Sequence, residues 1–362
     1  MMIRALSLTF LFALSHGAIL GKAFHVYSPS SKENTLWIVK ATTKGENLKL
    51  EVAEKVKFDF SGRVITTHPS KPLLYVTSTG GDPGKVPGAV VFLNEDGSYQ
   101  KHRKINFNDG ACYLSLDKGN RHLLGVSYGN GRLNVYPLDA NGIPGKAVTT
   151  IDEGKREAHC VLLPPDGKNV YVPYVKGNLA LLQYAYDDKT GKVTPLEPFD
   201  AKPPLGSGPR HMAYHPTLPM VYFSNEQGIG LSSYRRETNG QLKVEQDISI
   251  LPPGMSKIGL SASDLLITPD GQFLFAGLRG HRQDFSRISR YRVLEDGKAE
   301  FLGLTEADQV PWGLTLSPDG KFLLVSATTG ASLAAYRISK DGNLKRVATL
   351  AWDARMSDLV TR

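Results

Sequence analysis

Short, strongly apolar segments recur along the chain, and each follows a polar turn that is rich in Pro, Asp, Gly or Lys. A short β-type segment precedes each turn, and another alternating segment, such as 332–338, follows the apolar one. Short segments of this kind, separated by turn residues, are typical of antiparallel β-meanders. No part of the chain shows a convincing long helical period. The turn and its apolar segment occur at 68–76, 116–126, 165–172, 215–223, 269–275 and 318–325.

The spacing of these segments is nearly constant. A four-stranded unit that repeats roughly every 40 to 50 residues is typical of a β-propeller blade. A β-helix would have a shorter repeat, and stacked β-sandwiches would not repeat so regularly. The spacings are 47, 49, 51, 53 and 49 residues when the equivalent positions are Pro69, Leu116, Pro165, Pro216, Pro269 and Pro318.

Strand-like segments at both ends of the repeats leave material for one more blade. They lie at 24–40 and 344–352, and we expect the two ends to share this blade, because that closes the ring and leaves no open sheet edge. The sequence therefore predicts an all-β fold, a seven-bladed β-propeller of four-stranded antiparallel blades. Residues 24–362 would form this single domain.

The first 23 residues have the pattern of a secretory signal peptide. Arg4 precedes an apolar stretch at 5–14, and Gly21 and Ala23 offer small residues for cleavage. The apolar stretch is too short to span a bilayer. The alternative is a short uncleaved anchor. We expect an exported protein, periplasmic or secreted, without a transmembrane segment.

Charge and cysteine content narrow the function classes. The formal charge is +8, and removal of the leader lowers it to +6 (41 basic minus 35 acidic residues). The basic residues are scattered, which argues against a nucleic-acid partner. Cys112 and Cys160 cannot form a disulfide framework, although one bridge between them is compatible with an oxidising compartment. No CxxC or HExxH spacing occurs, so we predict no metal site of that kind and no cofactor.

Strand connectivity predicts which side chains share a face. The start of each inner strand and the end of the next strand lie on one face near the axis, opposite the Pro-Asp-Gly turns. Ten residues after the equivalent positions, the ionisable residues are Glu226 and Arg279. Six residues before them stand Arg63, Gly110, His159, Arg210, Ser263 and Trp312.

These offsets predict that one imidazole, two guanidinium groups and one carboxylate meet at the axis. Two arginines can hold a carboxylate, a phosphate or a developing oxyanion. A carboxylate or an imidazole can activate water or donate a proton to a leaving oxygen. The alternative is a salt-linked network without function. The four residues are His159, Arg210, Glu226 and Arg279, and their polar neighbours are Glu157, His211, Asn225 and Asp264.

Several segments resemble a known family. Residues 206–216, which contain Gly-Pro-Arg-His, and the Asn-Glu pair that ends 221–226 are similar to propeller-type 6-phosphogluconolactonases and to the related fungal carboxy-muconate cyclases. Supporting similarity lies at 157–160, at 263–271 with Arg279, and at 125–130. The resemblance covers essentially the whole chain after the leader.

This resemblance implies a seven-bladed propeller and a catalytic set that corresponds to His159, Arg210, Glu226 and Arg279. In the lactonases the implied reaction is hydrolysis of a sugar-acid lactone without a cofactor. In the cyclases it is reversible lactone formation, in which a substrate carboxylate adds to an alkene.

The chain departs from the family pattern at two positions. Leu266 stands where the family often has a histidine, and Trp312 stands where it often has an arginine. The loss of a cation at Trp312 argues against a phosphorylated substrate, as does the leader, because sugar phosphates are cytoplasmic. Trp312 also offers a surface on which a sugar ring can stack. The expected substrate-binding residues are His211, Asn225, Asp264, Trp312 and Arg63.

Three functions remain as hypotheses. The first is an exported lactonase that hydrolyses a sugar-acid lactone with activated water. The second is a cycloisomerase of the muconate type, which uses the same groups. The third is a non-catalytic propeller that binds a sugar or a protein partner. The sequence predicts a small-molecule ligand and does not predict an oligomeric state.

Overall fold

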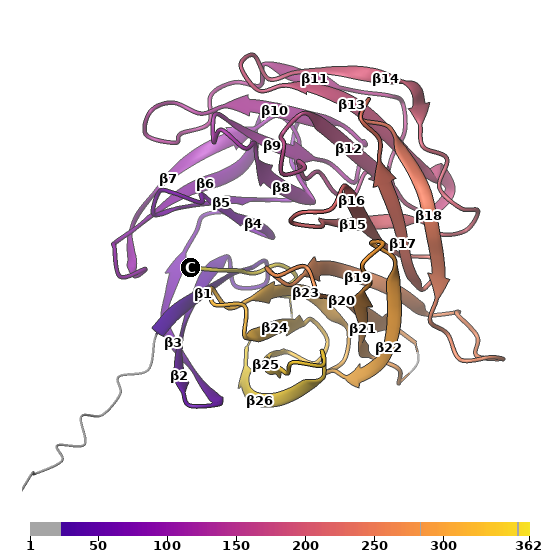
Figure 1. The fold of residues 1–362 in the computed structure, drawn as a ribbon. Coiled ribbons are helices and arrows are strands. Elements are labelled where there is room, and N and C mark those ends of the chain that lie inside the picture. Colours follow the sequence, from indigo (N-terminus) through magenta and orange to yellow (C-terminus); the bar gives the residue numbers. More distant parts are fainter. Residues whose placement is uncertain (1–22, 283, 353–354) are drawn as a thin grey trace, which may run out of the picture.

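The computed structural model describes residues 23–282, 284–352 and 355–362. Their strands form seven sheets arranged around a central axis (Figure 1). The helical content of these residues is one 3-10 turn, η1 (Lys176–Asn178). No helix among them has the length and apolar character needed to cross a bilayer. The predicted all-β, seven-bladed propeller is confirmed.

Each sheet is an antiparallel meander whose strands follow one another outward from the axis. From the axis outward, blade 1 contains β27 (Val360–Thr361), β1 (Ala23–Ser30), β2 (Thr35–Lys44) and β3 (Asn47–Lys57). Blade 2 contains β4 (Val64–Thr67), β5 (Leu73–Thr77), β6 (Val86–Leu93) and β7 (Tyr99–Phe107). Blade 3 contains β8 (Tyr113–Leu116), β9 (His122–Val126), β10 (Leu133–Pro137) and β11 (Thr149–Ile151).

The remaining four blades follow in chain order. Blade 4 contains β12 (Asn169–Tyr174), β13 (Ala180–Asp187) and β14 (Lys192–Asp200). Blade 5 contains β15 (Pro209–Tyr214), β16 (Met220–Asn225), β17 (Gly230–Arg236) and β18 (Leu242–Ser249). Blade 6 contains β19 (Leu260–Ile267), β20 (Phe273–Gly280), β21 (Arg287–Val293) and β22 (Ala299–Glu306). Blade 7 contains β23 (Pro311–Leu316), β24 (Phe322–Ala327), β25 (Ser332–Ile338) and β26 (Leu344–Ala351).

The two ends of the chain share blade 1, as expected, but the predicted C-terminal partner is wrong. Strand β27 closes the ring, with Val360 opposite Tyr27 and Thr361 opposite Val26. The segment predicted for this role forms β26, the outer strand of blade 7, because a tight hairpin turn at 339–343 pairs it with β25. The predicted leader lies outside the described residues except for Ala23, which begins β1.

Blade 4 departs from the four-stranded pattern. Its innermost segment makes only two isolated bridges to β12, at Ala158 and at Leu162. The His159 N–H donates to the Pro173 carbonyl over 3.0 Å, but proline has no N–H with which to return the bond. The Cys112 thiol instead approaches this segment and donates to the Ala158 carbonyl over 3.1 Å. The inner segment of blade 4 is therefore held by a few backbone hydrogen bonds and by the side chain of Cys112.

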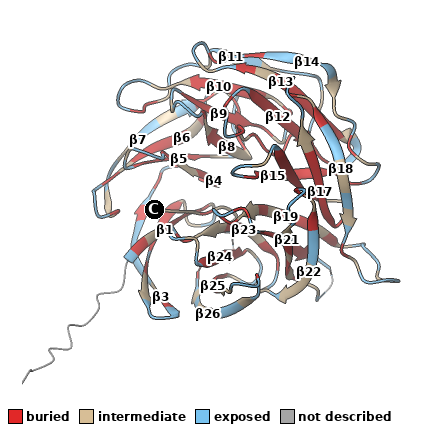
Figure 2. Ribbon diagram, in the orientation of Figure 1, coloured by how far each residue is buried: buried red, intermediate tan, exposed pale blue. Residues whose placement is uncertain are grey.

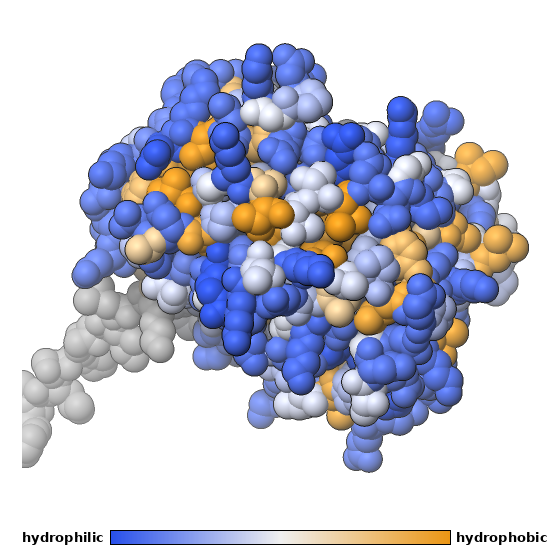
Figure 3. Space-filling view, turned by 90° about the horizontal axis from the view of Figure 1, so that it is seen from above, coloured by the Kyte–Doolittle hydropathy of each residue, from blue (hydrophilic) through white to orange (hydrophobic). Residues whose placement is uncertain are grey.

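Burial follows the radial order of the strands. The second strands, such as β5, β9 and β24, are buried throughout, whereas outer strands such as β3 and β7 are largely exposed (Figure 2). Viewed from above, the surface is mostly hydrophilic, with scattered hydrophobic groups (Figure 3). The apolar core lies between adjacent sheets, which holds the inner strands rigidly around the axis.

Buried tyrosines also connect neighbouring blades. In four blades a tyrosine of the second strand donates its hydroxyl to a glycine carbonyl in the outer hairpin turn of the next blade. Each bond satisfies two polar groups that would otherwise be buried without a partner. The pairs are Tyr27–Gly97 (2.6 Å), Tyr75–Gly142 (2.8 Å), Tyr171–Gly240 (2.6 Å) and Tyr222–Gly297 (2.8 Å).

Candidate active site

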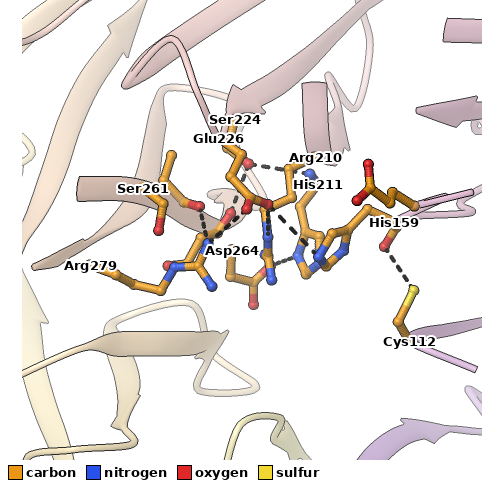
Figure 4. Close-up of polar contacts among 12 residues, drawn as sticks. Cys112, His159, Arg210, His211, Ser224, Glu226, Ser261, Asp264 and Arg279 are labelled. Atoms are coloured by element: carbon orange, nitrogen blue, oxygen red, sulfur yellow. Dashed lines mark hydrogen bonds and ion pairs between the residues drawn. The ribbon is translucent and has the colours of Figure 1, made fainter. Parts of the chain in front are cut away.

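A cavity of about 1430 Å³ follows the axis of the propeller. Its wall includes residues at the start of inner strands, such as Arg63 and Trp312, and residues at their far ends, such as Ile267 and Leu316. The four residues predicted to meet, His159, Arg210, Glu226 and Arg279, all line this cavity. Figure 4 shows them close together, contributed by blades 4, 5 and 6.

A left-handed residue helps to aim the axial side chains. In blades 4, 5 and 7 the residue two positions before the predicted axial residue has a positive φ. A backbone turn of this kind is costly for residues other than glycine and is typical of functional sites. In blade 5 the residue is the second glycine of the Gly-Ser-Gly-Pro-Arg-His segment. The three residues are Glu157 (φ 69°), Gly208 (φ 63°) and Val310 (φ 62°).

Shifts in strand register also turn side chains toward the cavity. The pairing of β15 with β16 shifts between Pro209 and Met212, and the shift encloses Arg210 and His211. Successive side chains of a regular strand point to opposite faces, but a bulge can re-aim one of them. Both Arg210 and His211 line the cavity as a result. Shifts at the same level of blades 6 and 7 lie between Ala262 and Leu265 and between Pro311 and Gly313.

Glu226 is the centre of an ion-pair cluster. Its Oε2 lies 3.1 Å from Arg210 Nε and 4.0 Å from His159 Nε2, and its Oε1 lies 3.7 Å from Arg279 Nη2. Arg279 Nη2 also donates to the Ala262 carbonyl over 2.8 Å. Arg210 is 1% exposed and Arg279 is 3% exposed, so both guanidinium groups are held away from bulk water.

Several polar atoms of this cluster lack a hydrogen-bond partner within the described part of the chain. They are Nε and Nη1 of Arg210, Nε of Arg279, Oε2 of Glu226 and Nδ1 of His159. Native proteins seldom leave buried polar atoms unsatisfied, and exceptions need a functional explanation. These atoms make the cluster the candidate binding site of the cavity.

The cluster shifts the pKa values of its members. The pKa of His159 lies well below its usual value, mainly because the ring is buried. The nearby Arg210 lowers this pKa further. Burial also lowers the pKa of Arg279 to about 9, with Arg210 as the second cause, while Glu226 opposes both. At neutral pH His159 is therefore a neutral imidazole that can accept a proton.

A second polar pair lies beside this cluster. His211 Nδ1 is 2.6 Å from Asp264 Oδ1, and the His211 ring centroid lies 5.1 Å from that of His159. Asp264 also accepts the backbone N–H groups of Leu265 and Leu314, over 2.9 and 2.8 Å. The histidine is the first cause that lowers the pKa of Asp264, against the opposing effect of burial, so this carboxyl is ionised.

The other predicted binding residues divide into two groups. Arg63 and Trp312 line the cavity, and Arg279 Cζ stands 4.4 Å from the Trp312 ring centroid. Asn225 does not line it. Its amide donates to Ser232 and Asp247 over 2.6 and 2.7 Å, because strand alternation turns it into blade 5. The structure therefore places Asn225 outside the cavity wall, and its role in substrate binding stays a prediction.

Neither the cysteines nor a serine motif supplies a nucleophile. Cys112 and Cys160 are both free, and burial raises the pKa of each thiol, for Cys112 to about 12. Ser127 lies in a Gly-x-Ser-x-Gly sequence, 125–129, but it is buried and does not line the cavity. No helix follows it, so the strand–turn–helix context of a nucleophile elbow is absent from this described segment.

Sequence reasoning missed several residues of the cavity wall. Tyr128 makes an edge-to-face contact with the His159 ring, with centroids 5.5 Å apart. It belongs to the 125–130 segment, which was part of the family resemblance. His281 and Lys257 lie on loops outside the counted offsets. Asp358 lies just before β27, the strand that closes the ring. The sequence prediction counted from the repeated turns, and none of these turns lies near Asp358.

Comparisons with known proteins agree with this fold. Residues 26–354 match the family described as "Lactonase, 7-bladed beta-propeller". The 6-phosphogluconolactonase of Klebsiella pneumoniae is 28% identical over 313 residues, which cover 86% of this chain and 89% of that protein. The 6-phosphogluconolactonase of Pectobacterium carotovorum is 28% identical over 334 residues, with coverage of 90% and 94%.

Solved structures show the same architecture at lower identity. A periplasmic gluconolactonase of Pseudomonas aeruginosa superimposes with a TM-score of 0.82 at 20% identity, over 94% of this chain and 99% of that one. A protein of Lactobacillus plantarum gives a TM-score of 0.79 at 15% identity, over 95% and 100%. Together with the family match over most of the sequence, the closed ring of seven sheets establishes that the chain belongs to the seven-bladed β-propeller lactonase family.

Proposed function

We propose that this protein is a lactonase that hydrolyses the ring ester of a sugar-acid lactone in its central cavity. The observation that carries the proposal is the buried cluster of His159, Arg210, Glu226 and Arg279, whose polar atoms are only partly paired. The names of its relatives, which are 6-phosphogluconolactonases, support the same reaction class.

The cluster has the groups that lactone hydrolysis requires. Arg210 and Arg279 can donate to the carbonyl oxygen and stabilise the negative charge that develops on it. His159 or Glu226 accepts a proton from the attacking water. The water oxygen bonds to the carbonyl carbon, the bond from that carbon to the ring oxygen breaks, and the ring oxygen takes the proton. The product is an open hydroxy acid, and no cofactor takes part.

The substrate that the cavity favours is an unphosphorylated sugar-acid lactone. Trp312 supplies an indole ring where the family resemblance led us to expect an arginine, and Arg279 Cζ lies 4.4 Å from the centroid of that ring. An aromatic ring beside the arginines favours contact with the sugar ring rather than with a phosphate. Arg63 and Lys257 still add positive charge to the wall, so the phosphorylated lactone is the necessary comparison.

The proposed site of action is outside the cytoplasm. The signal-like pattern of residues 1–23 is the basis for this assignment. The periplasmic gluconolactonase of Pseudomonas aeruginosa shares the fold, which agrees with it.

The first prediction tests catalysis with Arg210→Ala and Glu226→Gln. Loss of an oxyanion donor, as in Arg210→Ala, typically lowers kcat about 100- to 1000-fold. We expect a loss of similar size in Glu226→Gln, because Glu226 forms ion pairs with both arginines and holds them in place. Proton release from glucono-δ-lactone and from its 6-phosphate measures turnover, corrected for spontaneous hydrolysis. Thermal unfolding checks that the fold persists.

Arg235→Ala is the matched control for this experiment. Arg235 also pairs with a glutamate, Glu245, at 3.0 Å, but it lies on β17 away from the cavity. We expect this variant to keep wild-type turnover. Wild-type turnover in both Arg210→Ala and Glu226→Gln would refute the proposed mechanism. A faster reaction with the 6-phosphate than with the uncharged lactone would refute the proposed substrate.

A further inference from the structure

Two neighbouring imidazoles in the cavity wall each have a buried nitrogen without a partner. Among the described residues, neither His159 Nδ1 nor His211 Nε2 makes a hydrogen bond. The ring centroids are 5.1 Å apart with an interplanar angle of 65°. The two nitrogens are not hydrogen-bonded to each other in the structure, but rings this close can be joined by one bridging water or by a small rotation of one ring. The other nitrogen of each ring faces a carboxylate, as Figure 4 shows.

The Asp264 carboxylate determines which nitrogen of His211 carries the proton. It is ionised and lies 2.6 Å from His211 Nδ1, so this nitrogen must be the donor. A neutral His211 then has a lone pair at Nε2, which can only accept a hydrogen bond. A proton on His159 Nδ1 satisfies that acceptor, and it leaves His159 Nε2 as the lone pair that faces Glu226 and the cavity.

We propose that Asp264 and His211 are positioning residues that hold His159 in the tautomer needed for a general base. The contact between the two imidazoles forms directly or through one water. The inference rests on the proposed function, and it selects His159 over Glu226 as the base. Glu226 already forms ion pairs with Arg210 and Arg279, whereas His159 has a buried nitrogen without a partner that His211 can orient.

The proposed proton path balances at each step. His159 Nε2 takes a proton from water as the water oxygen bonds to the lactone carbonyl carbon. The resulting imidazolium donates from Nδ1 to His211 Nε2, and His211 donates from Nδ1 to Asp264, which stays ionised and stabilises the positive charge. The proton on His159 Nε2 passes to the ring oxygen when the ester bond breaks.

Other groups around the two rings affect their titration. His159 Nε2 faces Glu226, and the edge of its ring meets Tyr128, while Tyr113 packs against His211. Burial lowers the pKa of His211, as does Arg210, and Asp264 raises it. The remaining charged or titratable groups near the pair are Arg279, Asp358, Cys112 and Cys160.

Asp264→Asn is the principal test, because it keeps the shape and removes the charge. We expect kcat to fall at least about 100-fold with KM within about threefold of the wild type, since only the base is affected. A carboxylate raises the pKa of a nearby imidazole, so its loss moves the acid limb of the kcat/KM pH profile to lower pH. An unchanged kcat and pH profile would overturn the inference.

A second variant separates positioning from folding. His211→Phe keeps a ring of similar size but has no nitrogen, and we expect a similar loss of kcat. Because the two residues act as one unit, the double variant should be no slower than either single variant. Losses that multiply in the double variant would overturn the inference.

Asp200→Asn is the matched control. Asp200 accepts the backbone N–H groups of Leu181 and Lys202, over 3.0 and 2.9 Å, in the way that Asp264 accepts those of Leu314 and Leu265. It does not line the cavity. We expect the acid limb to stay in place in Asp200→Asn, whereas a shift equal to that of Asp264→Asn would contradict the specific role of Asp264.

The tautomers can be measured without substrate. Nitrogen-15 NMR of histidine-labelled protein should show a proton on Nδ1 of both His159 and His211, with signals assigned from His211→Phe and His159→Asn. An Nε2–H tautomer of either ring would overturn the inference. If the wild type hydrolyses no lactone, the proposed function fails, but this spectrum still decides whether the imidazole chain exists.

Discussion

At the residue scale, Trp312 is the cavity residue that departs from the arginine expected from the family resemblance. It lies at the start of β23, directly beside the Arg279 guanidinium group. The indole ring occupies the wall where a cation would extend the positive charge of the two arginines. The proposed preference for an uncharged substrate should therefore depend strongly on this residue.

Trp312→Arg should shift the preference toward the phosphorylated lactone. We expect the ratio of kcat/KM for the 6-phosphate to that for the uncharged lactone to rise about tenfold, the effect of one charge-assisted hydrogen bond. Paired kinetic assays with the two lactones measure this ratio. Trp312→Phe, which keeps an aromatic ring and adds no charge, should leave it within about twofold. No change in Trp312→Arg would mean that Trp312 does not determine specificity.

Asp358 makes a different contribution, to stability. Burial is the first cause that raises its pKa to about 8, and Asp264 is a further one. The folded protein therefore holds a proton on Asp358 at pH values where the unfolded chain, with an ordinary aspartate, has lost it. Between about pH 4 and pH 8 this group makes the folded state less stable as the pH rises.

Asp358→Asn should remove that dependence on pH. Each pH unit within the window changes the free energy of unfolding by at most about 1.4 kcal/mol for a single proton. The variant should therefore gain stability relative to the wild type between pH 5 and pH 8. Urea unfolding of both proteins at the two pH values measures the difference. Parallel pH dependence of the two proteins would show that Asp358 is ionised in the folded state.

At the scale of single elements, the inner strands are shaped by exceptions to regular β structure. The register break in β15 turns both Arg210 and His211 toward the cavity, although adjacent residues of a regular strand face opposite ways. In blade 4, Pro173 removes one donor from the ladder, so the segment that carries His159 is only loosely paired. The irregular strands thus carry the residues of the proposed active site, and the regular second strands behind them supply rigidity.

At the scale of the whole molecule, ring closure depends on the last few residues. Leu359 packs in the core cluster between blades 1 and 7, and the Arg362 backbone exchanges two hydrogen bonds with His25, of 2.7 and 2.9 Å. Without β27, the inner edge of blade 1 would be open, and Asp358 would lose its neighbours. Closure therefore couples the stability of the fold to the wall of the cavity.

Deletion of residues 359–362 should lower the thermal unfolding midpoint by about 10 °C or more, because it removes an inner strand and its apolar contacts. Differential scanning calorimetry measures this. A circular permutant serves as the control. A short loop joins its Arg362 to Ala23, and its new termini lie in the exposed turn at 95–96. We expect this permutant to unfold near the wild-type temperature. Equal midpoints for the truncated and wild-type proteins would show that β27 does not close the ring.

The sequence alone determined the repeat, the number of blades and the face on which His159, Arg210, Glu226 and Arg279 lie. These follow from local patterns and chain connectivity, which repeat from blade to blade. The pairing of His211 with Asp264 was not predicted. The sequence pattern indicates a regularly alternating strand and gives no sign of the bulge that turns His211 toward Asp264.

Only the tertiary structure decided which C-terminal strand closes the ring, where Asn225 points, and that Asp358 joins the cavity wall. Ring closure and the position of Asp358 depend on contacts between residues far apart in the chain, for which hydrophobic periodicity has no signal. The direction of Asn225 depends on the register of β16 with its neighbouring strand, which the sequence pattern alone does not specify.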